Sequence, residues 1–86
     1  MDASRMLTTD QLGTLVRQVR KAVGLRQDQL AGVANVGLRF IVDLEAGKST
    51  AQVGKVLQVL STLGCTVSVT PPPGLELPPP KPRKAR

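Results

Sequence analysis

The chain has no histidine, tryptophan or tyrosine, and it has one cysteine and one phenylalanine. These absences exclude a disulfide framework, zinc sites of the usual Cys/His types and histidine-based catalysis within one chain. They also argue against stacking of single-stranded nucleic acid, which depends on aromatic rings. No apolar run approaches a length of about 18 residues, which a membrane-spanning helix needs, and the N-terminus lacks the apolar core of a signal peptide. We therefore expect a cytoplasmic protein without a metal or cofactor.

Basic residues outnumber acidic ones. Among 86 residues, 12 Lys and Arg stand against 6 Asp and Glu, which gives a net charge of +6. Such a short chain has room for one small domain but little for a deep catalytic cleft, so we expect no enzyme. The excess of positive charge favours a polyanionic partner. Charge alone does not separate DNA from RNA or from a membrane surface.

All seven prolines lie in residues 71–86, PPPGLELPPPKPRKAR. Because proline lacks a backbone donor and restricts φ, neither a helix nor a central strand is expected to continue into this segment. We expect a basic tail that is polyproline-II-like or disordered. Before it, the sequence predicts an N-terminal arm (1–6), a helical domain (7–64) and a short strand (65–70).

Two capping boxes mark the beginnings of the first and last predicted helices. Thr8 and Gln11 form the first box, ahead of an apolar stripe that ends at Gly24. Ser49 and Gln52 are expected to form the second, ahead of another apolar stripe. In such a box each side chain accepts a hydrogen bond from the backbone of the other residue, which satisfies donors that the helix leaves free.

Two short helices are predicted between these two. The segment 27–34 and the segment from Gly37 to Gly47 both carry apolar residues at helical spacing. Asn35 lies between them and tolerates a left-handed backbone, and Ala31 is small enough for the second helix to approach. A helix, a short turn and a crossing helix make a helix-turn-helix. We therefore expect an all-α helix-turn-helix bundle of four to five helices.

Residues 65–70 alternate small apolar and polar side chains, which predicts a strand that includes Cys65. One strand cannot satisfy its own backbone groups, so we expect it to pair with the same strand of a second subunit. A monomer with about 64 ordered residues also buries too little surface to be more than marginally stable. The residues expected at the homodimer interface are Leu60, Leu63, Val67 and Val69.

The run 20–50, RKAVGLRQDQLAGVANVGLRFIVDLEAGKST, resembles the Cro/XRE-type helix-turn-helix family, and most closely the HipB-like antitoxins. The segments RFIVDLEAGK (39–48) and GKVLQVL (54–60) carry the closest similarity. Arg26 and Gly37 depart from the family, which usually has Ser or Thr at both positions. Contacts that the family makes through those hydroxyl groups therefore do not transfer to this chain.

The resemblance implies that the helix opened by Gly37 enters the major groove by its N-terminal end. Arg39 is the residue suited to a bidentate contact with guanine. The DNA-binding residues expected are Gln27, Gly37, Leu38, Arg39, Val42 and Lys48. Further candidates for phosphate contacts are Arg17, Arg20, Lys21 and Arg26, although a solvated helix face accounts for the first three as well.

Three nearby residues are given structural interpretations. Phe40 is expected to pack against the core, and Glu45 is expected to make a structural bond or an ion pair. Asp43 and Glu45 are not interpreted as a catalytic pair, because no general acid, base or metal ligand accompanies them.

Three functional hypotheses remain. The resemblance favours a nucleoid-associated repressor that binds a palindromic double-stranded DNA operator as a dimer. It would be the antitoxin of a type II toxin–antitoxin module and would neutralise a HipA-like Ser/Thr kinase toxin. The second hypothesis is a stand-alone or phage-type repressor without a toxin. The third is a protein-interaction module whose proline-rich tail (71–86) occupies an aromatic-lined groove.

Overall fold

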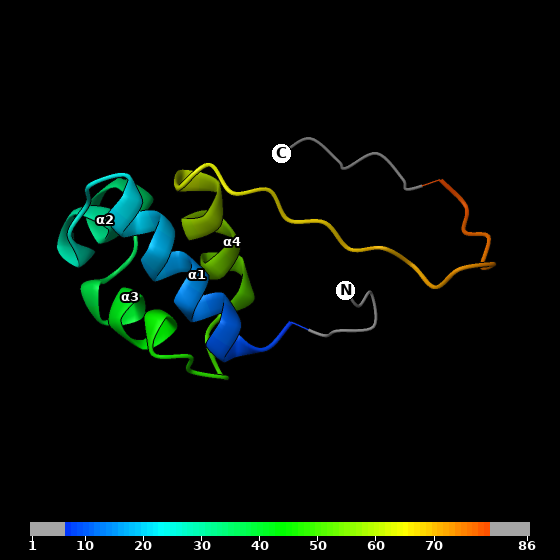
Figure 1. Ribbon diagram of the computed structural model, residues 1–86, viewed down its shortest axis with the longest axis horizontal. Helices are drawn as coiled ribbons and strands as arrows, with labels where there is room; N and C mark the ends of the chain where they lie inside the picture. The colour runs from blue at the N-terminus through cyan, green and yellow to red at the C-terminus, as the bar shows by residue number, and fades with distance from the viewer. Residues whose placement is uncertain (1–6, 80–86) are drawn as a thin grey trace.

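The structure, a computed structural model of the chain, describes residues 7–79. It contains four helices, α1 (Thr9–Ala22), α2 (Gln27–Ala34), α3 (Leu38–Glu45) and α4 (Val53–Thr62). The helices pack into one bundle, and the chain after α4 runs away from it (Figure 1). In the described part no helix has the length and apolar character to cross a membrane. The predicted N-terminal arm and the last seven residues of the tail lie outside the described residues.

The start of α1 confirms the first capping box. The backbone N–H of Thr8 donates to Oε1 of Gln11 (2.9 Å), and the backbone N–H of Gln11 donates to Oγ1 of Thr8 (3.1 Å). The second predicted box is wrong. Helix α4 begins after Gln52, which is itself the N-cap and makes no side-chain capping bond. The helix thus starts about one turn later than the spacing of Ser49 and Gln52 predicts.

The turn between α2 and α3 has the predicted geometry. Asn35 adopts the left-handed conformation (φ 59°, ψ 46°), and the next backbone N–H, from Val36, donates to the carbonyl oxygen of Ala31 at 3.0 Å. Helix α4 supports this turn from the side. Nε2 of Gln58 donates to the carbonyl oxygen of Ala34 at 2.6 Å, which satisfies an acceptor at the end of α2.

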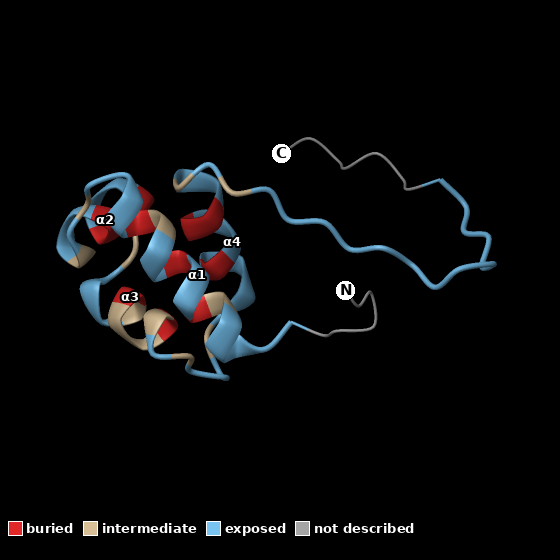
Figure 2. Ribbon diagram, viewed as in Figure 1, coloured by how far each residue is buried: buried red, intermediate tan, exposed pale blue. Residues whose placement is uncertain are grey.

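The core is built from all four helices (Figure 2). Phe40 is partly buried against it, which confirms its packing role, and Nζ of Lys55 lies 5.9 Å from the centre of the phenyl ring. Ala31 is buried, as a close approach of α2 and α3 requires. The buried apolar residues are Val16, Leu30, Ala31, Ala34, Ile41, Leu44, Val56, Val59 and Leu60.

A buried glycine lets α1 approach the end of α3. Gly13 has no side chain, and the carbonyl oxygens of Leu44 and Glu45 occupy the space that a β-carbon at this position would need. The sequence periodicity did not single out this glycine. It brings the C-terminal end of α3 directly against α1.

The predicted strand over 65–70 is not formed in the single chain, and the described residues contain no strand. After the N–H of Cys65 donates to the carbonyl oxygen of Leu60 (2.8 Å), residues 66–70 are exposed and leave the bundle. A strand needs a hydrogen-bonded neighbour, and no other segment within residues 7–79 supplies one. The interface role of Leu60 is also corrected, since this residue is 4% exposed and belongs to the core.

Candidate nucleic-acid interface

Helix α3 is anchored by one face and open on the other. Ile41 and Leu44 are buried in the core, whereas Leu38 and Arg39 are exposed at the beginning of the helix. Gly37 is the N-cap, and the space around its α-carbon is open. The first turn of α3 is therefore accessible to a large partner such as a duplex.

Two of the predicted DNA-binding residues share one carboxylate. Nε of Arg39 lies 3.3 Å from Oδ1 of Asp43, one helical turn later, and Nζ of Lys48 lies 3.5 Å from Oδ2 of the same residue. No role for Asp43 was expected from the sequence. The four-residue spacing of Arg39 and Asp43 could have indicated this ion pair, because residues four apart are neighbours on a helix surface.

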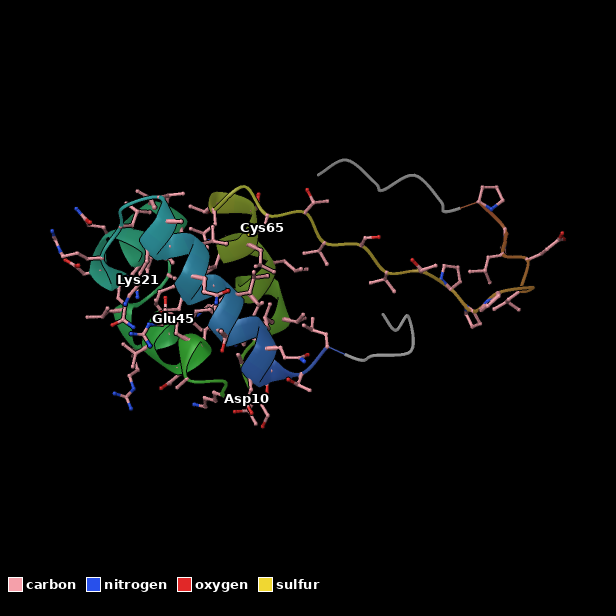
Figure 3. All side chains as sticks on the ribbon, in the orientation of Figure 1. Asp10, Lys21, Glu45 and Cys65 are labelled. Atoms are coloured by element: carbon pink, nitrogen blue, oxygen red, sulfur yellow. The ribbon has the colours of Figure 1, made fainter. Side chains whose placement is uncertain are left out.

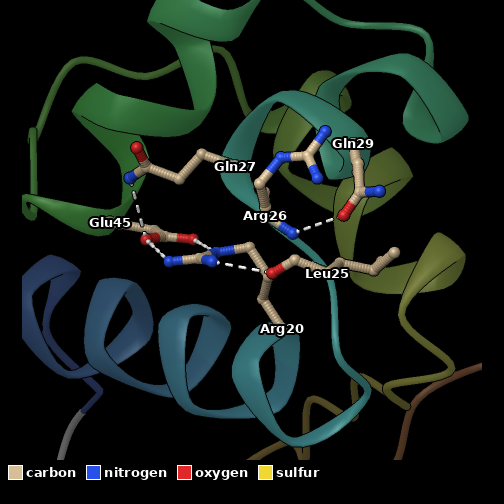
Figure 4. Close-up of polar contacts among 6 residues, drawn as sticks. All are labelled: Arg20, Leu25, Arg26, Gln27, Gln29 and Glu45. Atoms are coloured by element: carbon tan, nitrogen blue, oxygen red, sulfur yellow. Dashed lines mark hydrogen bonds and ion pairs between the residues drawn. The ribbon is translucent and has the colours of Figure 1, made fainter.

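Arg20 does not lie on a solvated helix face. Its guanidinium group is buried, so the expectation that Arg20 contacts a phosphate is wrong. Its Nε and Nη2 atoms donate to the two carboxylate oxygens of Glu45 at 2.6 and 2.9 Å, and Nη1 donates to the carbonyl oxygen of Leu25 at 2.9 Å (Figure 4). Nε2 of Gln27 donates to the same carboxylate at 3.1 Å. These bonds confirm that Glu45 forms a structural ion pair, and they join α1, α2 and α3.

The pKa values show that both members of this pair are held in the charged form. Burial raises the pKa of the Glu45 carboxyl group, but hydrogen bonds from Arg20 and Gln27 outweigh it and bring the pKa below its usual value. The hydrogen bond to Glu45 raises the pKa of the Arg20 guanidinium group. The cluster is therefore a fixed structural charge pair.

The other candidate phosphate contacts are accessible. Arg17 and Lys21 are exposed on α1, and Arg26 is exposed just before α2, 3.0 Å from Asp28. The backbone N–H of Arg26 donates to Oε1 of Gln29 at 2.8 Å. Arg17, Arg26, Gln27 and Val42 line one shallow depression. The tertiary structure thus brings the end of α1, the start of α2 and the open face of α3 together.

A second surface, the apolar groove, lies between α1, α4 and residues 65–68. Its exposed apolar residues are Leu7, Leu15, Val53, Leu57 and Val67. Helix α3 contributes no residue to it. Figure 3 shows Cys65 of this groove where the chain leaves α4, well separated from Glu45.

Comparison with known proteins identifies the family. The model of the helix-turn-helix domain family matches residues 11–71. An HTH-type transcriptional regulator, y4mF of Sinorhizobium fredii (strain NBRC 101917 / NGR234), is 67% identical over 70 residues, which cover 81% of this chain and 92% of the relative.

Solved structures of low sequence identity share the fold. A chain of the HipB-O4 20mer complex has a TM-score of 0.69 at 18% identity, over 79% of this chain and 96% of that chain. A chain of the HipA-HipB-O2-O3 complex has a TM-score of 0.70 at the same identity and coverage. The chain therefore belongs to the helix-turn-helix family of transcriptional regulators, and its four-helix fold is similar to that of HipB.

Proposed function

We propose that the protein is a sequence-specific repressor that inserts the first turn of α3 into the major groove of duplex DNA. The observation that carries this proposal is the placement of α3. Its buried face, with Ile41 and Leu44, is held by the core, while Arg39 projects into solvent from its first turn. A helix held in this way can enter a groove without refolding, so little ordering entropy opposes binding.

The surrounding residues divide into two kinds of contact. Arg39 reads guanine, and Leu38 and Val42 contact thymine methyl groups, because these side chains lie on or beside the open face of α3. Lys48 and Gln27 contact the backbone phosphates that flank the groove, and the remaining basic residues of this face support them. Those residues are Arg17, Lys21 and Arg26.

A homodimer is part of the proposal, because one recognition helix reads only a few base pairs. Two copies that present their α3 helices about 34–36 Å apart read two half-sites of a palindrome. The apolar groove supports this step, since its exposed side chains are of the kind that a subunit interface buries. Residues 65–70 would then gain the neighbouring strand that they lack in the single chain, with Leu63, Val67 and Val69 beside it.

We further propose the antitoxin role, in which the protein binds a HipA-like Ser/Thr kinase toxin. The support is the shared fold with HipB, which is found in a complex with HipA. The test is co-purification with the product of an adjoining kinase-like gene. A stand-alone repressor would show specific DNA binding and no such partner.

Binding-site selection tests the central proposal. The purified full chain is mixed with random duplexes, and the retained DNA is sequenced over several rounds. We expect a palindromic consensus whose half-sites are one helical turn apart, and we expect deletion of residues 71–86 to lower affinity but to leave the consensus unchanged. Retention of DNA without any enriched sequence would contradict the proposal. Loss of all partner binding with the tail would favour the protein-interaction module.

A further inference from the structure

The carboxylate of Asp43 lies between the two cations that the proposed function assigns to base and phosphate contacts. It faces Nε of Arg39 at 3.3 Å and Nζ of Lys48 at 3.5 Å. The side chain of Asp43 is 25% exposed, while that of Arg39 is 84% exposed. Asp43, whose side chain is mostly covered, thus contacts two more exposed basic side chains, Arg39 in the first turn of α3 and Lys48 just after its last turn.

Helix stability does not explain this arrangement. The positive charge of Arg39 lies in the first turn of α3 and the negative charge of Asp43 in its last turn, which is the unfavourable order for the helix dipole. The pair is also exposed on the arginine side, where ion pairs contribute little to folding. The Arg39–Asp43 pair therefore contributes little to the stability of α3.

We propose that Asp43 is a specificity-determining positioning residue of the DNA-binding surface. This inference rests on the proposed function. By holding Nε, the carboxylate orients the guanidinium group and leaves its terminal Nη groups for the O6 and N7 atoms of guanine. An arginine that is already oriented loses less side-chain entropy when it makes this bidentate contact.

The same carboxylate acts against wrong sequences. A negative charge beside the DNA backbone is repelled by phosphate, and it competes with phosphate for Lys48. On a duplex without the correct guanine, this repulsion is not offset by the oriented contact of Arg39. Asp43 thus strengthens binding to the duplex with the correct guanine and weakens binding to other duplexes. Sequence specificity commonly combines these two effects.

The test measures binding of two duplexes, one carrying the sequence selected by the wild-type protein and one a scrambled sequence of the same composition. For Asp43→Asn we expect roughly tenfold weaker binding of the selected duplex, within the range for one bidentate base contact. Binding of the scrambled duplex should strengthen, about two- to threefold, because one negative charge is removed. In an Arg39→Ala background, the Asp43→Asn change should no longer weaken binding of the selected duplex.

Asp28→Asn is the matched control. Asp28 is an exposed aspartate paired with an arginine, 3.0 Å from Nε of Arg26, to which the proposed function assigns phosphate contact and no base reading. Its substitution removes the same charge, so both duplexes should respond alike. An Asp43→Asn protein that shifts both duplexes by one common factor, as this control does, would overturn the inference. If the wild-type protein does not distinguish the two duplexes, the proposed function itself fails.

Discussion

Arg20 and Glu45 form a buried two-point ion pair that ties α1 to the C-terminal end of α3. Their side chains are 9% and 4% exposed, and the shorter contact, between Nε and Oε2, is 2.6 Å. The carbonyl oxygen of Leu25 and the amide of Gln27 complete the hydrogen bonding of the pair. In the part of the chain that the structure describes, no buried side-chain polar atom lacks a partner. The pair thus adds a polar link between α1 and α3 to their apolar packing.

Replacement of Arg20 by methionine should destabilise the protein by about 3 kcal/mol, because the carboxylate of Glu45 would remain buried without its cation. Urea denaturation gives the free energy of unfolding. Arg17→Met is the control, since Arg17 is an exposed residue of the same helix and its loss should change stability by less than about 0.5 kcal/mol. Equal losses for the two variants would mean that the pair adds nothing to the fold.

Lowering the pH should reduce the free energy of unfolding, because the carboxylate of Glu45 becomes protonated. The pKa of this carboxyl group is lower in the folded chain than in the unfolded one, so the unfolded chain binds more protons as the pH falls. The resulting stability is fully present above the unfolded pKa, about 4.3, and is lost as the pH falls through the folded pKa. The free energy of unfolding should therefore decline more steeply below about pH 4.3 in the wild type than in Glu45→Gln. Parallel pH profiles would contradict this assignment.

The close approach of α1 and α3 at Gly13 can be tested with two alanine substitutions of opposite expected sign. Gly13→Ala forces a methyl group against the carbonyl oxygens of Leu44 and Glu45 and should cost about 1–3 kcal/mol. Gly32→Ala introduces the same methyl group in open space within α2 and should stabilise by up to about 1 kcal/mol. Thermal unfolding distinguishes them. A stabilising Gly13→Ala would show that the helices are not in contact here.

The proposed dimer predicts that a charge in the apolar groove separates the subunits. Leu57→Lys should raise the dimer dissociation constant at least about tenfold, equivalent to about 1.4 kcal/mol, and Val67→Lys should act in the same direction. Sedimentation at several concentrations measures the effect. Val33→Lys is the control, because Val33 is exposed on α2 outside the groove. A wild-type protein that stays monomeric at high concentration removes this part of the proposal.

Two substitutions at the DNA-binding surface should have different consequences. Arg39→Ala should cost about 1–3 kcal/mol on the selected sequence and relax the preference at one base pair. Lys48→Ala should weaken binding to all sequences similarly and reduce the dependence on log salt by about one. Gel shifts at several salt concentrations separate these patterns. Identical behaviour of the two variants would contradict the division between base and phosphate contacts.

Features that depend on neighbours within four or five residues were predictable from the amino-acid order. The Thr8–Gln11 capping box, the bounds of α2 at 27–34 and the left-handed Asn35 all occur as expected. Backbone hydrogen bonding and side-chain sterics within one turn determine each of them. The family was identified from the resemblance of residues 20–50, and of the four to five helices expected, four are present among the described residues.

Apart from the Ser49–Gln52 capping box, which was a local error, the errors concern residues whose surroundings come from distant parts of the chain. Helical spacing placed Arg20 on a polar face, yet Glu45, 25 positions later, covers it. Leu60 was expected at an interface, but packing of the four helices buries it. The strand expected at residues 65–70 is not formed in the single chain, where the described residues supply no hydrogen-bonded neighbour, and its pairing across a dimer stays a prediction.

Local sequence therefore specified which segments are helical and, except at the beginning of α4, roughly where they begin and end, because those preferences are satisfied within each segment. The fold alone placed the arginines of this chain in different roles, Arg20 inside the bundle and Arg39 on its open surface. The physical reason is that burial and charge pairing depend on which helices meet, and helices meet through contacts between residues far apart in the sequence.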